Sequence, residues 1–351
     1  MACNMRCRLS ADWCLIRWYA QVTGEHKTRV RLWVSDDPAV GGRIEIMNRI
    51  GVLEQKTNVL SRFTAPGLSR AAFYSEDNGY ETIKHASGCT NCTADPTGIP
   101  YRYFPSQMST FLSDGRDQLS VALAHSHAVG SLANGTLDVV QHRRGYALTH
   151  VDGNLALDDA DRVSSETWIS IGNISASNRL RHSNKLRLNH PLAIVFGQGS
   201  LGSNPAGLRD RFGRQPASPP AVPSAPAQIH LQTIRATDVS ANELMLNVMH
   251  LFGKDELPAE DSAPADINLA ALLTAFRPDA AASVHETTLS GLIPKKDLKR
   301  YRWKTVKPGI SRSGGNDAKG GAVDGEEDAL KLDAVTMVPF NLRTFLASTT
   351  P

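Results

Sequence analysis

Two adjacent arginines, Arg143 and Arg144, end a polar stretch that can bind a small polar ligand. Their guanidinium groups stay charged, and the forked N–H donors suit sugar hydroxyls or a carboxylate. The stretch 141–144 (QHRR) follows an alternating, strand-like pattern. Because successive strand residues point to opposite faces, only one of the two arginines can face a cleft. The simpler alternative is a surface arginine in a loose ion pair.

His125 and His127 form a second candidate, a possible metal site. Alternate residues of a strand project from one face, and two imidazoles at that spacing can hold a metal ion. No third ligand can be located from the sequence. The alternative is a polar strand end that faces solvent, or one histidine hydrogen-bonded at the rim of a sheet.

Carboxylates and aromatic residues are the remaining candidates for hydrolytic chemistry. Glycoside cleavage uses two carboxylates at a fixed separation. Acidic residues are dense at 158–161 and 326–328, although solvated loops are the simpler interpretation of both. Aromatic residues can be sugar platforms or core residues, and four are candidates: Tyr101, Tyr103, Phe104 and Trp168. Neither a Gly-x-Ser-x-Gly elbow nor a His-Glu-x-x-His motif occurs, so no catalytic set is complete.

Cysteines and glycosylation sequons bear on the cellular compartment. Cys89 and Cys92 form one Cys-x-x-Cys pair, which can be a metal site, a local disulfide or free thiols; Cys3, Cys7 and Cys14 lie near the N-terminus. Three sequons begin at Asn91, Asn134 and Asn173. They matter only in a secreted or lumenal protein, and therefore support that compartment without establishing it.

The composition excludes several classes of protein. The chain has 351 residues, of which 41% are hydrophobic and 21% charged, as is usual for a globular protein. The formal net charge is only +3 and no block of Lys and Arg follows a phosphate backbone, which argues against nucleic acid as a partner. No apolar run is long enough for a membrane span or resembles a signal peptide. Glycine-rich phosphate-binding motifs are also absent.

Apolar residues recur with a period of two, which predicts an all-β protein. Alternation is clear at 30–34, 44–46, 119–123, 137–139, 229–231 and 244–248. Turn residues such as Asn134-Gly135 separate these runs. We therefore predict half-buried antiparallel strands in a β-sandwich. Helical periodicity is scarce: residues 267–276 can form a short helix or a buried strand, and 294–302 a surface helical turn.

Composition shifts along the chain predict two β domains. The first domain is predicted at 1–204, and a linker rich in Pro, Ala and Ser follows at 205–228. The second, smaller domain is predicted at 229–351. A polar segment near 308–330 has almost no apolar anchor, so we expect a disordered insertion there.

A set of short motifs runs in a fixed order along the chain. In the first predicted domain they are 45–51 (EIMNRIG), 62–63 (RF), 73–79 (FYSEDNG), 103–105 (YFP), 118–121 (QLSV) and 141–144 (QHRR). In the second they are 228–233 (QIHLQT), 286–290 (ETTLS), 302–303 (RW) and 342–348 (LRTFLAS). Single motifs are weak evidence, but their order is specific, and together they span about residues 28 to 348. This ordered set resembles family 38 glycoside hydrolases, and most closely the lysosomal-type α-mannosidases.

The resemblance implies the C-terminal β-sandwiches of such an enzyme: a large galactose-mutarotase-like sandwich followed by a smaller one. In the resembled family, an N-terminal α/β domain carries the zinc and the nucleophile, and no His-x-Asp metal motif precedes Leu32 here. The resemblance therefore implies no catalytic or zinc-binding residue in this chain. It implies a sugar-contacting arginine at Arg143 or Arg144, and it argues against a metal at His125 and His127, where the family binds no zinc.

The leading hypothesis is a carbohydrate-binding scaffold of an α-mannosidase that hydrolyses terminal α-linked mannose in glycans. The expected partners are mannose-containing glycans and the α/β catalytic domain, and the chain alone is expected to be inactive. The resemblance implies a lysosomal or other secretory-pathway lumen. The alternatives are a free-standing carbohydrate-binding module and a truncated product without function.

Overall fold

The structure is a computed structural model. It describes residues 6–10, 13–23, 26–34, 42–55, 57–85, 102–145, 158–191, 225–237, 240–254, 256–276, 283–298 and 330–348. These residues belong to two compact units, one formed by Met1–Phe196 with Asp255–Glu260 and the other by Gly197–Lys254 with Asp261–Pro351. The predicted linker at 205–228 and the predicted insertion near 308–330 lie almost entirely outside the described residues, so both stay predictions.

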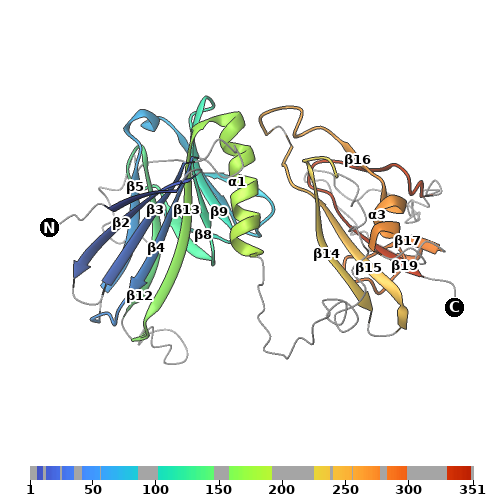
Figure 1. Cartoon of the computed structure of the whole chain (residues 1–351), viewed down its shortest axis with the longest axis horizontal. Coiled ribbons are helices and arrows are strands. Elements are labelled where there is room, and N and C mark those ends of the chain that lie inside the picture. The colour runs from blue at the N-terminus through green and yellow to red at the C-terminus, as the bar shows by residue number, and fades with distance from the viewer. Residues whose placement is uncertain are drawn as a thin grey trace, which may run out of the picture. The chain divides into compact units, whose positions relative to one another are not determined.

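The first unit contains two antiparallel sheets (Figure 1). In spatial order, the large sheet consists of β1 (Arg6–Ser10), β2 (Trp13–Thr23), β3 (His26–Val34), β4 (Arg43–Ile50), β13 (Val163–Asn173), β10 (Asp117–Leu123), β9 (Ser109–Ser113), β6 (Ala72–Glu76) and β7 (Thr82–His85). The small sheet consists of β5 (Thr57–Thr64), β12 (Thr136–Arg144), β11 (His127–Gly130) and β8 (Tyr103–Ser106). A short 3-10 helix, η1 (Pro66–Leu68), follows β5.

The period-two pattern of the sequence builds the core of this unit. Leu119, Val121 and Leu123 of β10 belong to one buried cluster with Leu137 and Val139 of β12. Alternate residues of a strand share a face, so each sheet contributes one apolar face to the space between them. The prediction of an all-β antiparallel sandwich is confirmed.

Helix α1 (Ile174–Asn189) was not predicted, and its buried face explains why. This face is polar; its buried residues are Ser177, Asn178, Arg181, His182, Asn184 and Lys185. An apolar periodicity search cannot detect a helix of this kind. The helix packs on β10, where Gln118 is fully buried and donates to the side chains of Ser120 and Asn178. The prediction that β10 is only half-buried is therefore wrong.

The second unit is a smaller β structure. One sheet has the order β14 (Ile229–Thr237), β15 (Ser240–His250), β19 (Leu342–Ser348), β17 (Ser283–Thr287), and β16 (Ala265–Ile267) pairs with β18 (Val335–Met337). Helix α3 (Leu269–Phe276) buries Leu272 and Leu273 in the same core as Leu246 and Phe345. Residues 267–276 thus form the short helix that was one of two predicted options. A 3-10 turn, η4 (Lys295–Asp297), lies within the segment predicted as a surface turn.

Among the described helices, neither α1 nor α3 is both long enough and apolar enough to cross a lipid bilayer.

Candidate functional site

A β-bulge in β12 separates the environments of Arg143 and Arg144. The register between β12 and β5 shifts between Val140 and His142, which leaves Gln141 as the extra residue. Gln141 and His142 are both buried, and Arg143 after them is exposed. The bulge therefore sends the two arginines to different surroundings, as strand alternation requires.

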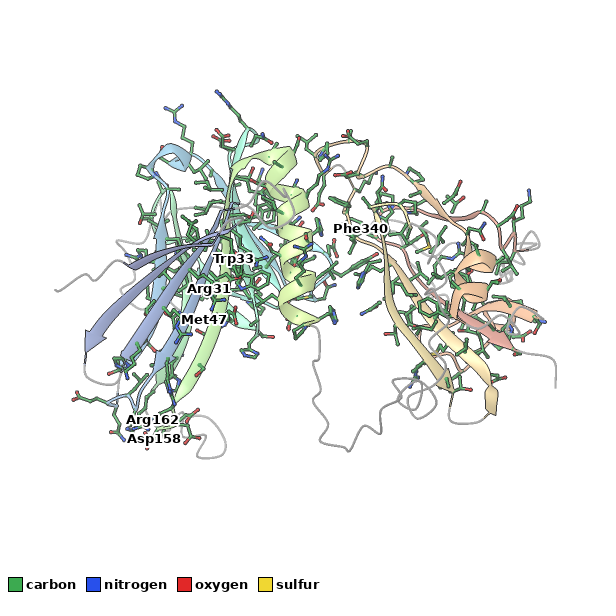
Figure 2. The ribbon with its side chains drawn as sticks, in the orientation of Figure 1. Arg31, Trp33, Met47, Asp158, Arg162 and Phe340 are labelled. Carbon is green, nitrogen blue, oxygen red and sulfur yellow. The ribbon has the colours of Figure 1, made fainter. Side chains whose placement is uncertain are left out.

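Arg144 is held by its own unit. Its Nε donates to Oδ1 of Asp158 at 2.6 Å, and its Nη1 donates to the backbone carbonyl of Leu53, also at 2.6 Å. The hydrogen bond from Arg144 holds the pKa of the Asp158 carboxyl below its usual value. Figure 2 shows Asp158 near the end of the first unit. Arg144 thus joins three parts of the chain, and two of its three nitrogens donate to structural partners.

Arg143 differs from Arg144 in its contacts. It is exposed, and among the described residues no hydrogen bond or ion pair involves its guanidinium group. Its cross-strand neighbour is Asn58 of β5, which is also exposed. The sequence left open which arginine can contact a ligand; in the structure Arg143 is the more exposed of the two, and its donors have no partner among the described residues.

Other polar residues share the outer face of the small sheet with Arg143. Asn58, Leu60 and Arg62 are alternate, exposed residues of β5, and Arg62 stands opposite Asp138 of β12. We call Asn58, Leu60, Arg62, Tyr103 and Arg143 the β5–β12 face. It carries amide, guanidinium and phenol donors beside one exposed leucine, a mixture that can bind the hydroxyls and the apolar face of a sugar.

A buried carboxylate organises one end of the β5–β12 face. Asp138 is fully buried, and it accepts from Nε of Arg62 at 2.6 Å and from Nη2 at 2.8 Å. The hydroxyl of Tyr103 donates to the same carboxylate at 3.4 Å. Burial and this carboxylate raise the pKa of Tyr103, so its hydroxyl keeps its proton. The sequence motifs included Arg62 but gave no signal for this pairing, because the partner lies 76 residues away along the chain.

His142 and Gln141 have structural roles. The Nε2 of His142 lies 3.1 Å from the carbonyl oxygen of Asp161, and the side chain of Gln141 accepts a hydrogen bond from Ser165. Both residues lie below the surface that Arg143 occupies. They fix the bulge and thereby the direction of Arg143.

His125 and His127 do not form a metal site with other described residues. The Nδ1 of His127 lies 2.8 Å from the carbonyl oxygen of Val140, and burial lowers the pKa of this imidazole. His125 is exposed in the turn before β11. Within the described ranges, no three His, Cys, Asp or Glu side chains come together as metal ligands, so the described residues do not fit the zinc that the resemblance implies.

The other sequence candidates are dispersed. Phe104 packs against the core of the first unit, and Trp168 lies on the outer face of the large sheet. Asn134 is exposed in the turn before β12, and Asn173 is the exposed N-cap of α1. Cys7 and Cys14 fall in β1 and β2. Several candidates lie outside the described residues: Cys3, Cys89, Asn91, Cys92, Tyr101 and the acidic residues at 326–328.

Comparison with curated proteins finds α-mannosidases. The chain is 27% identical over 294 residues to the epididymis-specific α-mannosidase of Homo sapiens, an alignment that covers 75% of this chain and 27% of that protein. It is 25% identical over 304 residues to the lysosomal α-mannosidase of Mus musculus, with 83% of this chain and 27% of that protein covered. An α-mannosidase of Arabidopsis thaliana is 23% identical over 350 residues, which are 94% of this chain and 31% of that protein. No family model matches the chain.

Comparison with solved structures finds the same fold. An α-mannosidase from Enterococcus faecalis V583 superposes with a TM-score of 0.53 and 11% identity over 98% of this chain and 35% of that one. A second Enterococcus faecalis protein, of glycosyl hydrolase family 38, superposes with a TM-score of 0.50 and 10% identity. The resemblance to family 38 α-mannosidases is thus confirmed. The chain spans about a quarter of the length of the first curated relatives.

Proposed function

We propose that this chain is a β-sandwich region of a family 38 α-mannosidase, and that it completes the mannose site of that enzyme by supplying contacts to the sugar. The observation that carries the proposal is the alignment with α-mannosidases over three quarters or more of the chain. The antiparallel sandwich shared with two Enterococcus faecalis proteins supports the same assignment of fold.

Arg143 is the residue to which we assign the sugar contact. It follows the His142 position of the motif that carries the resemblance, and its guanidinium group is exposed on the β5–β12 face. A guanidinium group donates several hydrogen bonds from a planar fork and cannot act as a proton acceptor at neutral pH. Arg143 therefore orients a sugar ring through its hydroxyls and takes no part in bond breaking.

The chemistry of bond cleavage is assigned to the zinc-bearing catalytic domain that the resemblance implies. Zinc supplies a Lewis acid when bound in such a domain. The described residues of this chain offer no ligand set for it, so their contribution is binding and orientation. We accordingly expect the isolated chain to release no mannose from an aryl α-mannoside, with or without added zinc.

The lumen of the secretory pathway is the compartment that we propose. Several curated relatives are named lysosomal α-mannosidases. The side chain of Asn134 is exposed in a turn, where an oligosaccharyltransferase can reach it, and glycosylation there would fit this compartment. Expression in a secreting host followed by mass spectrometry tests this point, because the Asn134→Gln variant should lose one glycan.

A chimera tests the proposed function directly. The chain replaces the corresponding region of the lysosomal α-mannosidase of Mus musculus, and hydrolysis of p-nitrophenyl α-mannoside is measured. The chimera should be active, and Arg143→Ala should raise KM about tenfold or more, as expected for a lost charge-assisted hydrogen bond. Arg143→Lys, which keeps the charge but loses the fork, should fall between the two. A folded but inactive chimera, or an unchanged KM in Arg143→Ala, would overturn the proposal.

A free-standing carbohydrate-binding module is the second candidate function. The observation that favours it is the exposure of Arg143, Arg62 and Leu60 together on one sheet face. Titration of the isolated chain with methyl α-mannoside separates the two functions. Saturable binding that is lost in Arg143→Ala favours the module, whereas no binding favours a contact that exists only in the longer enzyme.

A further inference from the structure

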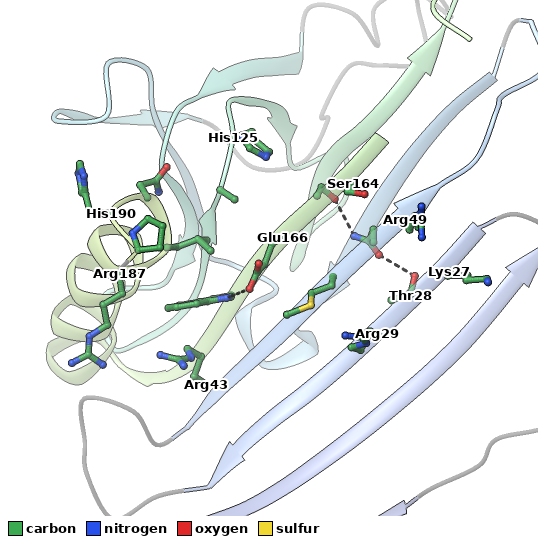
Figure 3. Close-up of a pocket in the computed structure, with 18 residues that line it drawn as sticks. Lys27, Thr28, Arg29, Arg43, Arg49, His125, Ser164, Glu166, Arg187 and His190 are labelled. Atoms are coloured by element: carbon green, nitrogen blue, oxygen red, sulfur yellow. Dashed lines mark hydrogen bonds between the residues drawn. The ribbon is translucent and has the colours of Figure 1, made fainter. Parts of the chain in front are cut away.

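A second surface of the first unit carries a groove that the proposed mannose contact does not use. The groove has a volume of about 1430 Å³ and lies on the outer face of the large sheet, beside the C-terminal end of α1 (Figure 3). Its lining residues come from strands β3, β4 and β13, from the turn at 124–125 and from the C-terminal end of α1 with the two residues after it. Ligand pockets commonly have volumes of about 300–1000 Å³, so this groove can hold more than one sugar ring.

The lining of the groove is strongly basic. Five cationic side chains line it: Lys27, Arg29, Arg43, Arg49 and Arg187. Two histidines, His125 and His190, also reach it, and Glu166 is the one carboxylate among the described residues of the lining. Figure 3 shows Lys27, Arg29 and Arg49 on the strands and Arg187 on the helix. This concentration stands out in a chain whose total net charge is only +3.

One end of the groove neutralises its cations internally. Glu45 is 3% exposed; it accepts from Nη1 of Arg31 at 2.8 Å and from Nη2 of Arg43, also at 2.8 Å. The guanidinium group of Arg43 also stacks over the ring of Trp168, with 3.9 Å between the guanidinium carbon and the ring centroid. The charges of these two arginines are balanced within the sheet by Glu45, although the Nε of each has no hydrogen-bond partner among the described residues.

At the other end, the described residues provide no counter-charge for two cations. Lys27 and Arg49 stand directly opposite each other in the antiparallel register of β3 and β4, and both are exposed. Like charges at such positions repel each other and destabilise a sheet. Among the described residues, no carboxylate forms an ion pair with Lys27 or Arg49. The nearest acid of the lining, Glu166, accepts a hydrogen bond from Nε1 of Trp168 at 2.7 Å.

We propose that the Lys27–Arg49 end of this groove binds an anionic saccharide, a sugar that carries a phosphate or sulfate ester. The ester anion lies between Lys27 and Arg49, where it removes the repulsion between two facing cations. This inference rests on the proposed function for the sugar part of the ligand and on the charges of the groove for the anion.

The polar row beneath the cations belongs to the inner face of the sheet, because residues of a strand alternate between its two faces. Thr28 donates to Asn48 at 2.9 Å, and Asn48 donates to Ser165 at 3.4 Å, which links β3, β4 and β13 under the Lys27–Arg49 pair. The recessed shape of the site fits a small ligand better than a flat protein surface.

Calorimetric titration of the full chain at low salt tests the proposal with four probes: mannose 6-phosphate, mannose 6-sulfate, mannose and inorganic phosphate. The test variant is Lys27→Gln with Arg49→Gln. The control is Arg70→Gln with Lys84→Gln, which removes the same charge at two exposed residues that do not line the groove. Mannose 6-phosphate or mannose 6-sulfate should bind, with affinity roughly tenfold or more weaker in the test variant and unchanged in the control.

Other results would overturn the proposal. They are no binding of either ester, equal binding in the test variant, equal affinity for free mannose, or inorganic phosphate that binds as tightly as the sugar esters. An ester that binds the chain but not the active chimera would assign the groove to a protein interface and overturn the proposal as well. Failure of the proposed function is separate, because an inactive chimera leaves ester binding by the chain unaffected.

Discussion

Arg144 and Asp158 form an ion pair with 2.6 Å between Nε and Oδ1, whereas Arg143, the preceding residue, has no such partner among the described residues. Two adjacent residues of identical type therefore differ in role. The first presents its donors to the surroundings, and the second ties β12 to the backbone at Leu53 and to the segment before β13. Mutation of each arginine should affect a different property of the protein.

The Arg144→Ala variant should be less stable than Arg143→Ala. Truncation of Arg144 removes both its hydrogen bonds and leaves the Leu53 carbonyl without this donor. Truncation of Arg143 should change the free energy of unfolding by no more than about 0.5 kcal/mol, as is usual for exposed side chains. Urea unfolding followed by circular dichroism measures both. Equal midpoints for the two variants would contradict the structural role of Arg144.

The Gly135→Ala variant should be destabilised more than Gly115→Ala. Both glycines have positive φ, +68° and +91°, which costs alanine roughly 1 kcal/mol at either site. At Gly135 a methyl group would also lie 2.7 Å from the carbonyl oxygen of Ala65, whereas Gly115 faces open space. We expect a further loss of about 1–3 kcal/mol at Gly135. Thermal unfolding of the pair isolates the steric contribution, and similar losses would refute it.

The strands were predictable because apolar residues alternate with polar or small residues along them. The runs at 30–34, 119–123 and 137–139 lie in β3, β10 and β12. Helix α1 was not predictable by the same means, because Arg181, Lys185 and their neighbours are buried by pairing with charges instead of by apolar packing. A rule that looks for apolar faces treats such a helix as a solvated segment.

The candidate site could be located but not resolved from the sequence. The motif identified Arg143 and Arg144 together, but the bulge at Gln141 depends on strand register, which is a long-range property. The facing cations Lys27 and Arg49 were not predicted for the same reason: they are 22 positions apart in the sequence and become neighbours only when β3 pairs with β4. Cross-strand pairs require knowledge of which strands are adjacent.

The Arg181→Met variant should lose about 3–5 kcal/mol of stability. Arg181 is fully buried, and it donates to Glu76 at 2.9 Å and to Glu256 at 2.6 Å. Its removal takes the arginine from the buried carboxylate of Glu256 and leaves Glu76 with Lys185, at 2.7 Å, as its cation, so buried negative charge loses compensation. Arg179→Met is the matched control on the same helix, since the ion pair of Arg179 with Glu260 is exposed and worth at most about 1 kcal/mol. Denaturant unfolding distinguishes them, and equal losses would contradict the importance of burial.

The Asn173→Ala variant should lose about 1 kcal/mol through the loss of a helix cap. The side-chain oxygen of Asn173 accepts from the backbone N–H of Ala176 at 2.9 Å at the start of α1. Alanine cannot accept this bond, whereas aspartate can, so Asn173→Asp should retain the stability of the parent. Chemical denaturation of the two variants checks the prediction. A loss of equal size in Asn173→Asp would show that the cap is unimportant.

Burial of His182 makes the stability of the first unit sensitive to acid. Burial, assisted by the cations Arg181 and Lys185, lowers the pKa of His182 from 6.5 to about 3. Its Nε2 lies 2.8 Å from the carboxylate of Glu256. Burial alone would raise the pKa of Glu256, but Arg181 and His182 lower it below its usual value of 4.5. In the folded unit the imidazole is therefore neutral and the carboxylate ionised in mildly acidic solution.

Between pH 6.5 and pH 3, the unfolded chain protonates His182 and the folded chain does not, so the free energy of unfolding should decrease as the pH falls. The decrease is at most about 1.4 kcal/mol per pH unit for one group. Glu256 adds to this decrease below pH 4.5, because the carboxylate of the unfolded chain takes up a proton before that of the folded chain.

Urea unfolding at intervals between pH 7 and pH 4 measures the slope of the free energy of unfolding against pH. His182→Asn removes the titrating group and should flatten the slope between pH 6.5 and 4.5 relative to the parent, whatever stability the variant has at pH 7. A slope equal to that of the parent would show that His182 is protonated in the folded unit.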